Sequence, residues 1–120
     1  MGFGAATLHG WRDLPVDEAW AAIEPPEGLP KLGIATGADD ANRLSVQSAA
    51  ALFTHDGAGH QIKVNKATTG DTASLLFQSG YTGHAEMGLA GEIGFSIKVS
   101  ADGSAWSQAL AFDAATGQVS

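Results

Sequence analysis

The chain has 120 residues, of which 44% are hydrophobic and 16% charged, so it is long enough for one domain and apolar enough to bury a core. It contains no cysteine, which excludes disulfides and thiolate metal sites. Six basic against thirteen acidic residues give a net charge of −7, which disfavours nucleic-acid phosphates and anionic lipids as partners.

The sequence shows neither a secretory signal peptide nor a membrane span. No basic stretch near the N-terminus leads into an apolar run, and no apolar run approaches ~20 residues. We therefore expect no membrane insertion, and we expect a protein that leaves the cell by lysis or inside a particle.

Composition changes near residue 31 and predicts two regions. All four prolines precede residue 31, and residues 1–40 carry seven acids against two bases. Residues 41–120 carry six acids against four bases. We expect an attachment or linker segment with a short helix over residues 1–31, followed by a β-domain over residues 32–120.

The N-terminal segment carries the helix signal. Pro15 suits the first turn of a helix, and Pro25 stops it. One apolar stripe at helical spacing is formed by Val16, Ala19, Trp20 and Ile23. A helix of about ten residues is marginal by itself, so this stripe either packs on its own domain or anchors the chain to a neighbouring subunit. Val16, Trp20 and Ile23 are the candidate residues for particle attachment.

From residue 43 onward, short runs of strand-forming residues alternate with turns that contain glycine. The predicted strands are Arg43–Gln47, Ala50–His55, His60–Asn65, Thr72–Gln78, Ala85–Leu89, Phe95–Ser100, Trp106–Phe112 and Gln118–Ser120. Glycine supplies the positive φ that tight turns need, and Asp-Gly is a strong hairpin signal. A spacing of about ten residues per strand predicts an all-β fold, an antiparallel β-sandwich or a barrel-like, jelly-roll-like domain.

The side-chain pattern also bears on assembly. Apolar residues alternate with polar ones over Phe95–Val99, and Ile62 and Val64 share one face of their predicted strand. The run Leu75–Phe77 breaks this alternation and predicts a strand that is apolar on both sides. A lone domain of about 80 residues has little core to cover both sides, so we expect a homo-oligomer.

Signals for a metal site are weak. His55, Asp56 and His60 lie around a glycine-rich turn and suggest a two-histidine start to a site, with His84 as a further candidate ligand. A closed site needs three or four ligands, and the spacing fixes no third one. The alternative is that both histidines are solvated hairpin ends, and we expect no metal and no cofactor.

Signals for catalysis are also weak. The acids available for glycoside cleavage by paired carboxylates are Asp71, Glu86, Glu92, Asp102 and Asp113. All except Glu86 lie in or beside turns, where acids are ordinary. No nucleophile elbow, phosphate-binding loop, zinc-protease motif or dinucleotide fingerprint occurs. We expect no catalytic residues and no enzymatic activity.

Aromatic residues in loops are the better candidates for a binding site. Tyr81 lies in the glycine-rich stretch Ser79–Gly83, and Trp106 follows the turn Asp102–Ser104. Flat amphipathic side chains of this kind stack on sugar rings, although a tryptophan in this position also packs over its hairpin. Tyr81, His84 and Trp106 are the candidate carbohydrate-binding residues.

Several runs of the sequence resemble a domain of unknown function found in fibre and spike proteins of alphaproteobacterial prophages and gene transfer agents. The runs that carry the resemblance are Gly57–Gln61, Asn65-Lys66, Gly70–Gln78, Ala85–Gly91, Lys98–Ser100, Asp102–Ser104 with Trp106, and Thr116–Val119. The resemblance covers residues 32–120.

The resemblance implies a module on the surface of a phage-like particle. Such proteins are typically β-rich homotrimers whose tips contact host cell-surface polysaccharide and whose N-terminal parts attach to other particle proteins. Two alternatives stay open: a purely structural connector or base without sugar binding, and a polysaccharide-degrading enzyme on a β-scaffold. A simple carbohydrate-binding module would differ from all of these in being a monomer that needs no particle.

Overall fold

The computed structural model describes residues 27–120. The predicted helix and the attachment residues Val16, Trp20 and Ile23 lie outside the described residues, and so does most of the predicted segment 1–31. The chain divides into two compact units, residues 1–54 and residues 55–120. The boundary that the sequence predicts near residue 31 therefore stays a prediction, and each unit is described by itself.

The described part of the first unit contains a small parallel sheet. Strands β1 (Leu32–Ile34) and β2 (Leu44–Val46) pair in parallel, and the flanking residues extend the pairing through bonds from Leu32 N to Arg43 O (2.7 Å) and from Gln47 N to Ile34 O (2.9 Å). β2 lies within a predicted strand, whereas β1 has no signal in the sequence. Parallel pairing was not expected, because two parallel strands usually need a longer connection than residues 35–43.

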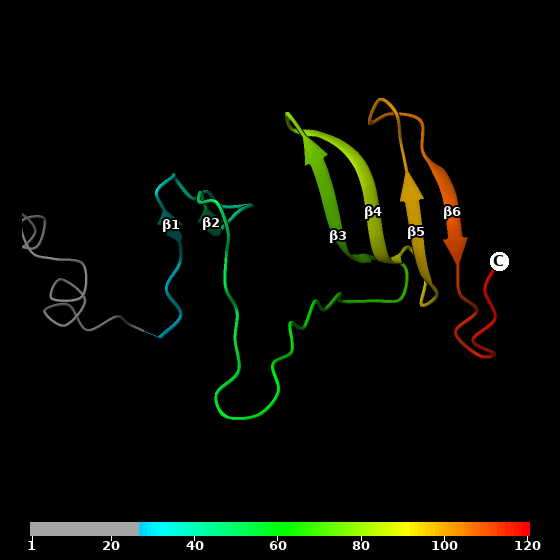
Figure 1. Cartoon of the computed structure of the whole chain (residues 1–120), viewed down its shortest axis with the longest axis horizontal. Helices are drawn as coiled ribbons and strands as arrows, with labels where there is room; N and C mark the ends of the chain where they lie inside the picture. The colour runs from blue at the N-terminus through cyan, green and yellow to red at the C-terminus, as the bar shows by residue number, and fades with distance from the viewer. Residues whose placement is uncertain (1–26) are drawn as a thin grey trace, which may run out of the picture. The chain divides into compact units, whose positions relative to one another are not determined.

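Two predicted strands, Ala50–His55 and His60–Asn65, are wrong. Residues 50–65 belong to no strand of the structure and follow an irregular path before β3 (Figure 1). Alternating apolar and polar residues make a segment suitable for a sheet, but a strand also needs a neighbouring backbone to pair with. Residues 60–65 thus have the side-chain pattern of a strand but no paired strand among residues 27–120.

The second unit is built on an antiparallel meander, which confirms the predicted all-β fold. Its strands β3 (Thr72–Ser79), β4 (Thr82–Ala90), β5 (Phe95–Val99) and β6 (Ser107–Ala111) lie in sequence order in one sheet (Figure 1). Each of them overlaps a predicted strand. β3 and β4 are longer than predicted, because the turn between them takes only two residues. The described residues contain no helix.

The C-terminal residues pair back onto the end of β6. Phe112 and Val119 form an isolated antiparallel bridge, and Ala111 and Ser120 exchange two backbone hydrogen bonds of 2.9 and 2.8 Å. The predicted strand Gln118–Ser120 therefore exists as a single bridge. The turn between its two sides places Gly117 at a φ of +77°, which an L side chain rarely adopts.

The strand register gives this sheet two different faces. One face, which we call the apolar face, carries Ala73, Leu75, Phe77, Ala85, Met87, Leu89, Phe95, Ile97 and Val99. The other face carries Leu76 among mostly polar residues, of which Ser74 Oγ donates to Glu86 Oε2 at 2.6 Å. Ala73 is the one buried hydrophobic residue among residues 27–120, and no large side chain there is fully buried.

The side chain of Lys66 links the start of β3 to the end of β4 through hydrogen bonds to backbone carbonyl groups. Lys66 Nζ lies within hydrogen-bond distance of the carbonyl oxygens of Thr69 (3.0 Å), Asp71 (3.0 Å), Leu89 (3.3 Å) and Glu92 (2.7 Å), which share its three N–H groups. The first two carbonyls belong to the turn before β3, and the other two lie where β4 passes into β5. One half-buried lysine side chain thus satisfies backbone acceptors from both segments.

We expect Lys66→Met to lower the free energy of unfolding by about 2 kcal/mol, because it leaves four backbone carbonyls without their charged donor. The measurement is chemical denaturation at fixed protein concentration. Lys63→Met is the matched control, since it removes the same charge from an exposed side chain. Equal losses in both variants would show that the carbonyl cluster contributes nothing.

Candidate functional site

The residues with binding potential gather at one end of the four-stranded sheet. The β3–β4 turn and the β5–β6 loop lie at the same end, the upper one in Figure 1. We call residues 79–84 and 100–106 together the tip. The tip contains all three residues that the sequence predicts for carbohydrate binding: Tyr81, His84 and Trp106.

Tyr81 occupies the two-residue turn between β3 and β4. Gly80 and Tyr81 have φ values of +54° and +66°, the signs that a type I′ hairpin turn requires at both central positions. A tyrosine in the left-handed region is strained, and such strain tends to persist at functional positions. The Tyr81 side chain is 94% exposed, so its ring contributes almost nothing to packing.

His84 lies at a β-bulge. Phe77 pairs with Ala85 and Gln78 pairs with Gly83, which leaves His84 as an extra residue on β4 with no partner in β3. Its backbone oxygen accepts a hydrogen bond from Ser100 N at 2.9 Å, and its Nδ1 lies 2.8 Å from Ser100 O. A carbonyl oxygen only accepts, so Nδ1 carries the proton in this contact, and Nε2 is directed elsewhere.

The β5–β6 loop is held in shape by Asp102. Its Oδ1 accepts hydrogen bonds from the backbone N–H groups of Ser104 (2.8 Å) and Ala105 (2.9 Å). Ser100 Oγ adds a further bond to the same carboxylate at 3.3 Å and accepts one from Gly103 N at 2.8 Å. These bonds, with that from Ala105 as the largest contribution, hold the pKa of Asp102 below its ordinary value.

Trp106 closes the loop against the start of β4. Its Nε1 donates to Gly103 O at 3.2 Å, and its ring lies over Gly83, where an added Cβ would lie 3.2 Å from atoms of both Trp106 and Leu76. The second interpretation of the sequence, in which this tryptophan packs over its hairpin, thus describes its position. Trp106 nevertheless remains 36% exposed. Trp106 thus lies over Gly83, the residue of β4 that directly precedes His84 and follows Tyr81 by two positions.

Two glycines that the sequence did not single out make this arrangement possible. Gly83 leaves the space that the Trp106 ring occupies. Gly103 has a φ of +82°, and a Cβ there would lie 2.8 Å from Thr82 Cγ2. The turn pattern Asp-Gly marks the loop, but the close approach between the two turns depends on the strand register.

The other predicted candidates lie apart from the tip. His55 accepts a hydrogen bond at Nδ1 from Gly57 N at 2.9 Å, in the irregular segment before β3. Asp71 and Asp113 accept bonds from backbone N–H groups of their own turns, and Glu86 is bonded to Ser74. Within residues 27–120, no three side chains of the metal-ligating types His, Cys, Asp and Glu come together.

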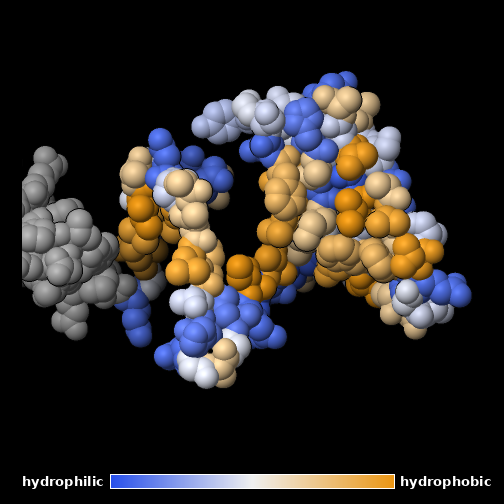
Figure 2. Space-filling view, in the orientation of Figure 1, coloured by the Kyte–Doolittle hydropathy of each residue, from blue (hydrophilic) through white to orange (hydrophobic). Residues whose placement is uncertain are grey.

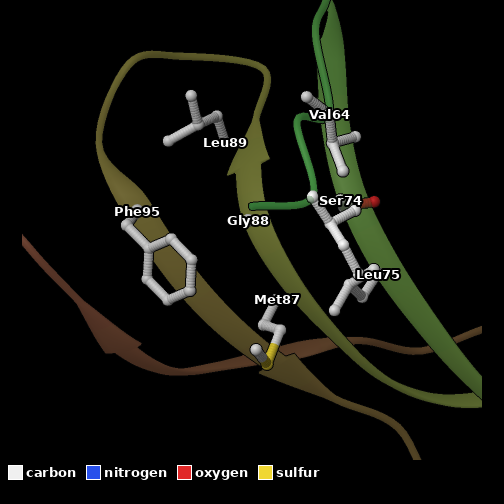
Figure 3. A pocket seen from close by; sticks show the side chains of 9 residues that line it. Val64, Ser74, Leu75, Met87, Gly88, Leu89 and Phe95 are labelled. Atoms are coloured by element: carbon white, nitrogen blue, oxygen red, sulfur yellow. The ribbon is translucent and has the colours of Figure 1, made fainter. Parts of the chain in front are cut away.

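A groove lies on the apolar face, away from the tip. It has a volume of about 240 Å³ and is lined by Ile62 and Val64 from the irregular segment and by residues of β3, β4 and β5 (Figure 3). Figure 3 shows Leu75, Met87 and Phe95 around it. Gly88 also lines it, with a φ of +149° and no room for a Cβ beside the backbone of Ala73 and Ser74. The lining offers no acid–base group.

Comparisons with protein families, with curated proteins and with solved structures give no match for this chain. In residues 27–120, the structure contains no helix long and apolar enough to cross a membrane.

The lowered pKa of Asp102 predicts how the tip responds to acid. The ionised carboxylate stabilises the loop above the ordinary pKa of 3.8, and this stabilisation is lost as pH falls through the lowered value. We expect the Trp106 indole N–H resonance to hold its position down to about pH 4 and to shift below it. In Asp102→Asn this transition should vanish. Titration of the Asp102 carboxyl at or above 3.8 would contradict the assignment.

We expect Gly103→Ala to displace the β5–β6 loop, because the new methyl group meets Thr82 and the backbone φ is unfavourable. The matched control is Gly117→Ala, which has a φ of +77° but open space around it. Both variants carry the backbone strain, so the contact itself should cost about 1–2 kcal/mol more in Gly103→Ala, measured by denaturation. Identical stabilities would mean that the loop does not rest on Thr82.

Proposed function

We propose that this protein is a spike or fibre subunit on the surface of a phage-like particle or gene transfer agent, and that its tip binds host cell-surface polysaccharide. The observation that carries the proposal is Tyr81, an almost fully exposed aromatic side chain in a strained turn. A tyrosine that packs on nothing and costs backbone strain is readily explained by a ligand that stacks on it.

Other features of the tip support the same function. His84 keeps its Nε2 directed away from the bond with Ser100, and Trp106 adds a second, partly exposed aromatic ring beside β4. Sugars are recognised by such combinations of flat apolar surfaces and fixed polar groups. The resemblance to fibre and spike domains over residues 32–120 adds the particle context, with attachment through Val16, Trp20 and Ile23.

The proposal describes a binding protein and not an enzyme. The carboxylates of Asp102 and Glu86 are each engaged in hydrogen bonds within the fold, the first with backbone and Ser100 donors and the second with Ser74. A polysaccharide-degrading enzyme would release new reducing ends from host capsule, and we expect none after prolonged incubation with the purified chain.

Substitution of Tyr81 by asparagine separates binding from stability. Asparagine tolerates positive φ, so we expect Tyr81→Asn to keep the fold or to stabilise it by up to about 1 kcal/mol. Retention of host capsule polysaccharide should fall roughly fivefold, because a stacking contact contributes about 1 kcal/mol. The measurements are thermal unfolding and a glycan pull-down on the same samples.

Tyr81→Phe is the matched control, since it keeps the ring and should retain the polysaccharide. Loss of binding in both variants would point to the hydroxyl group and not to stacking. Unchanged retention in Tyr81→Asn would remove the tip as the receptor site. Absence of any retention by the unaltered chain would favour the connector, whose contacts lie with other particle proteins.

A further inference from the structure

The strongest unexplained feature of the second unit is the exposure of its apolar face. Five large side chains on one side of the sheet are each between 37% and 52% exposed: Leu75, Phe77, Phe95, Val99 and Leu110, the last of which is paired with Ile97. Figure 2 shows hydrophobic residues gathered over this unit. Soluble monomers rarely expose a contiguous patch of this kind unless it is an interface.

The irregular segment before β3 extends this patch. Ile62 and Val64 are 66% and 50% exposed and line the same groove as Leu75 and Phe95. With typical side-chain areas of about 150–200 Å², these two and the five large side chains expose roughly 600 Å². That area approaches the ~800 Å² that each partner contributes to a standard protein interface.

The charge distribution favours a second copy of this chain as the partner. The register places no Asp, Glu, Lys or Arg on the apolar face, and it places Glu86 and Lys98, which are paired across β4 and β5, on the opposite face. A chain with a net charge of −7 repels its copies over most surfaces, but this face can approach another without opposing charges. The apolar face can also pack on the same face of a second copy, since apolar sheet faces pack on one another in layers.

We propose that the apolar face, with Ile62 and Val64 at its margin, is the interface through which copies of this chain assemble. The assembly supplies the second layer that the sheet lacks within residues 55–120. This inference deepens the proposed particle function, on which it rests, by naming the surface through which its oligomer forms. It concerns one face of the sheet, whereas polysaccharide binding concerns the tip, so the two can fail separately.

Single cysteines test which face is covered, because the chain has none of its own. Leu75 and Leu76 are neighbours on β3 with opposite faces and similar exposure, 47% and 50%. Light scattering should first show that the full chain is an oligomer at micromolar concentration. The thiol of Leu75→Cys should then react with a maleimide at least ~10-fold more slowly than that of Leu76→Cys, the matched control.

Charge substitution gives a second readout. Leu75→Asp should reduce the oligomer to monomers, whereas Leu76→Asp should leave its mass unchanged. If Leu75→Asp fails to fold, the cysteine pair still decides the matter, since both cysteine variants keep an apolar side chain.

Three results would overturn the inference. The first is a monomer in which both thiols react equally. The second is a monomer in which the thiol at position 75 is protected, which would show that another segment of the same chain covers the face. The third is an oligomer in which position 76 and not 75 is protected. A glycan pull-down on the unaltered chain and on the Leu75 variants reports on the proposed function independently, because the tip residues are unchanged there and Leu75 lies on the face opposite to Leu76 and Gly83.

Discussion

The constraint on which the second unit depends is that a single sheet has two faces, and residues 55–120 by themselves cover neither of them fully. Within residues 27–120, the hydrophobic effect acts on partly exposed side chains, and Ala73 is the one buried hydrophobic residue. Within the described residues, the meander is therefore stabilised mainly by the backbone hydrogen bonds between its strands and by the hydrogen bonds of its turns. Its hydrophobic stabilisation rests on whatever surface lies against the apolar face.

Polar groups at the ends of the strands compensate for the small core. Three aspartates, Asp39, Asp102 and Asp113, each accept hydrogen bonds from backbone N–H groups two and three residues further along the chain. These bonds lower the pKa of each carboxyl and close the turn that contains it. Lys66 does the converse for backbone carbonyl groups at the end of the sheet opposite the tip, where it donates hydrogen bonds to them. Three of the thirteen acidic residues of the chain thus have a structural role in turns.

The meander could be predicted from the sequence because its signals are local. Glycines and aspartates mark the turns, and alternation marks Phe95–Val99 as a strand with one apolar side. The same logic fails at His60–Val64, whose alternation is as clear but which pairs with no strand within residues 27–120. It also misses β1 and the parallel pairing of β2, because three-residue strands are too short to show a period.

The sequence predicts each of the two turns that form the tip, but it does not predict that they lie together. A glycine-rich stretch around Tyr81 indicates an exposed turn, and the Asp-Gly pair before Trp106 indicates a second one. Their meeting depends on the registers of β4 with β5 and of β5 with β6, which together bring Trp106 over Gly83. No local pattern identifies Gly83 as the position over which the indole ring lies, or His84 as the bulge.

The bulge at His84 has a geometric effect that reaches beyond its own hydrogen bonds. Side chains along a strand alternate between faces, and one extra residue reverses the phase of that alternation. Gly83 thereby lies on the side of Leu76 and Gln78, while Ala85 lies with Leu75 and Phe77. The residues of β4 before the bulge therefore direct their side chains to the face opposite to the one that strict alternation would give them. One inserted residue thus separates the orientation of the aromatic tip from that of the apolar face, so that two surfaces can point in different directions although both arise from the same pair of strands.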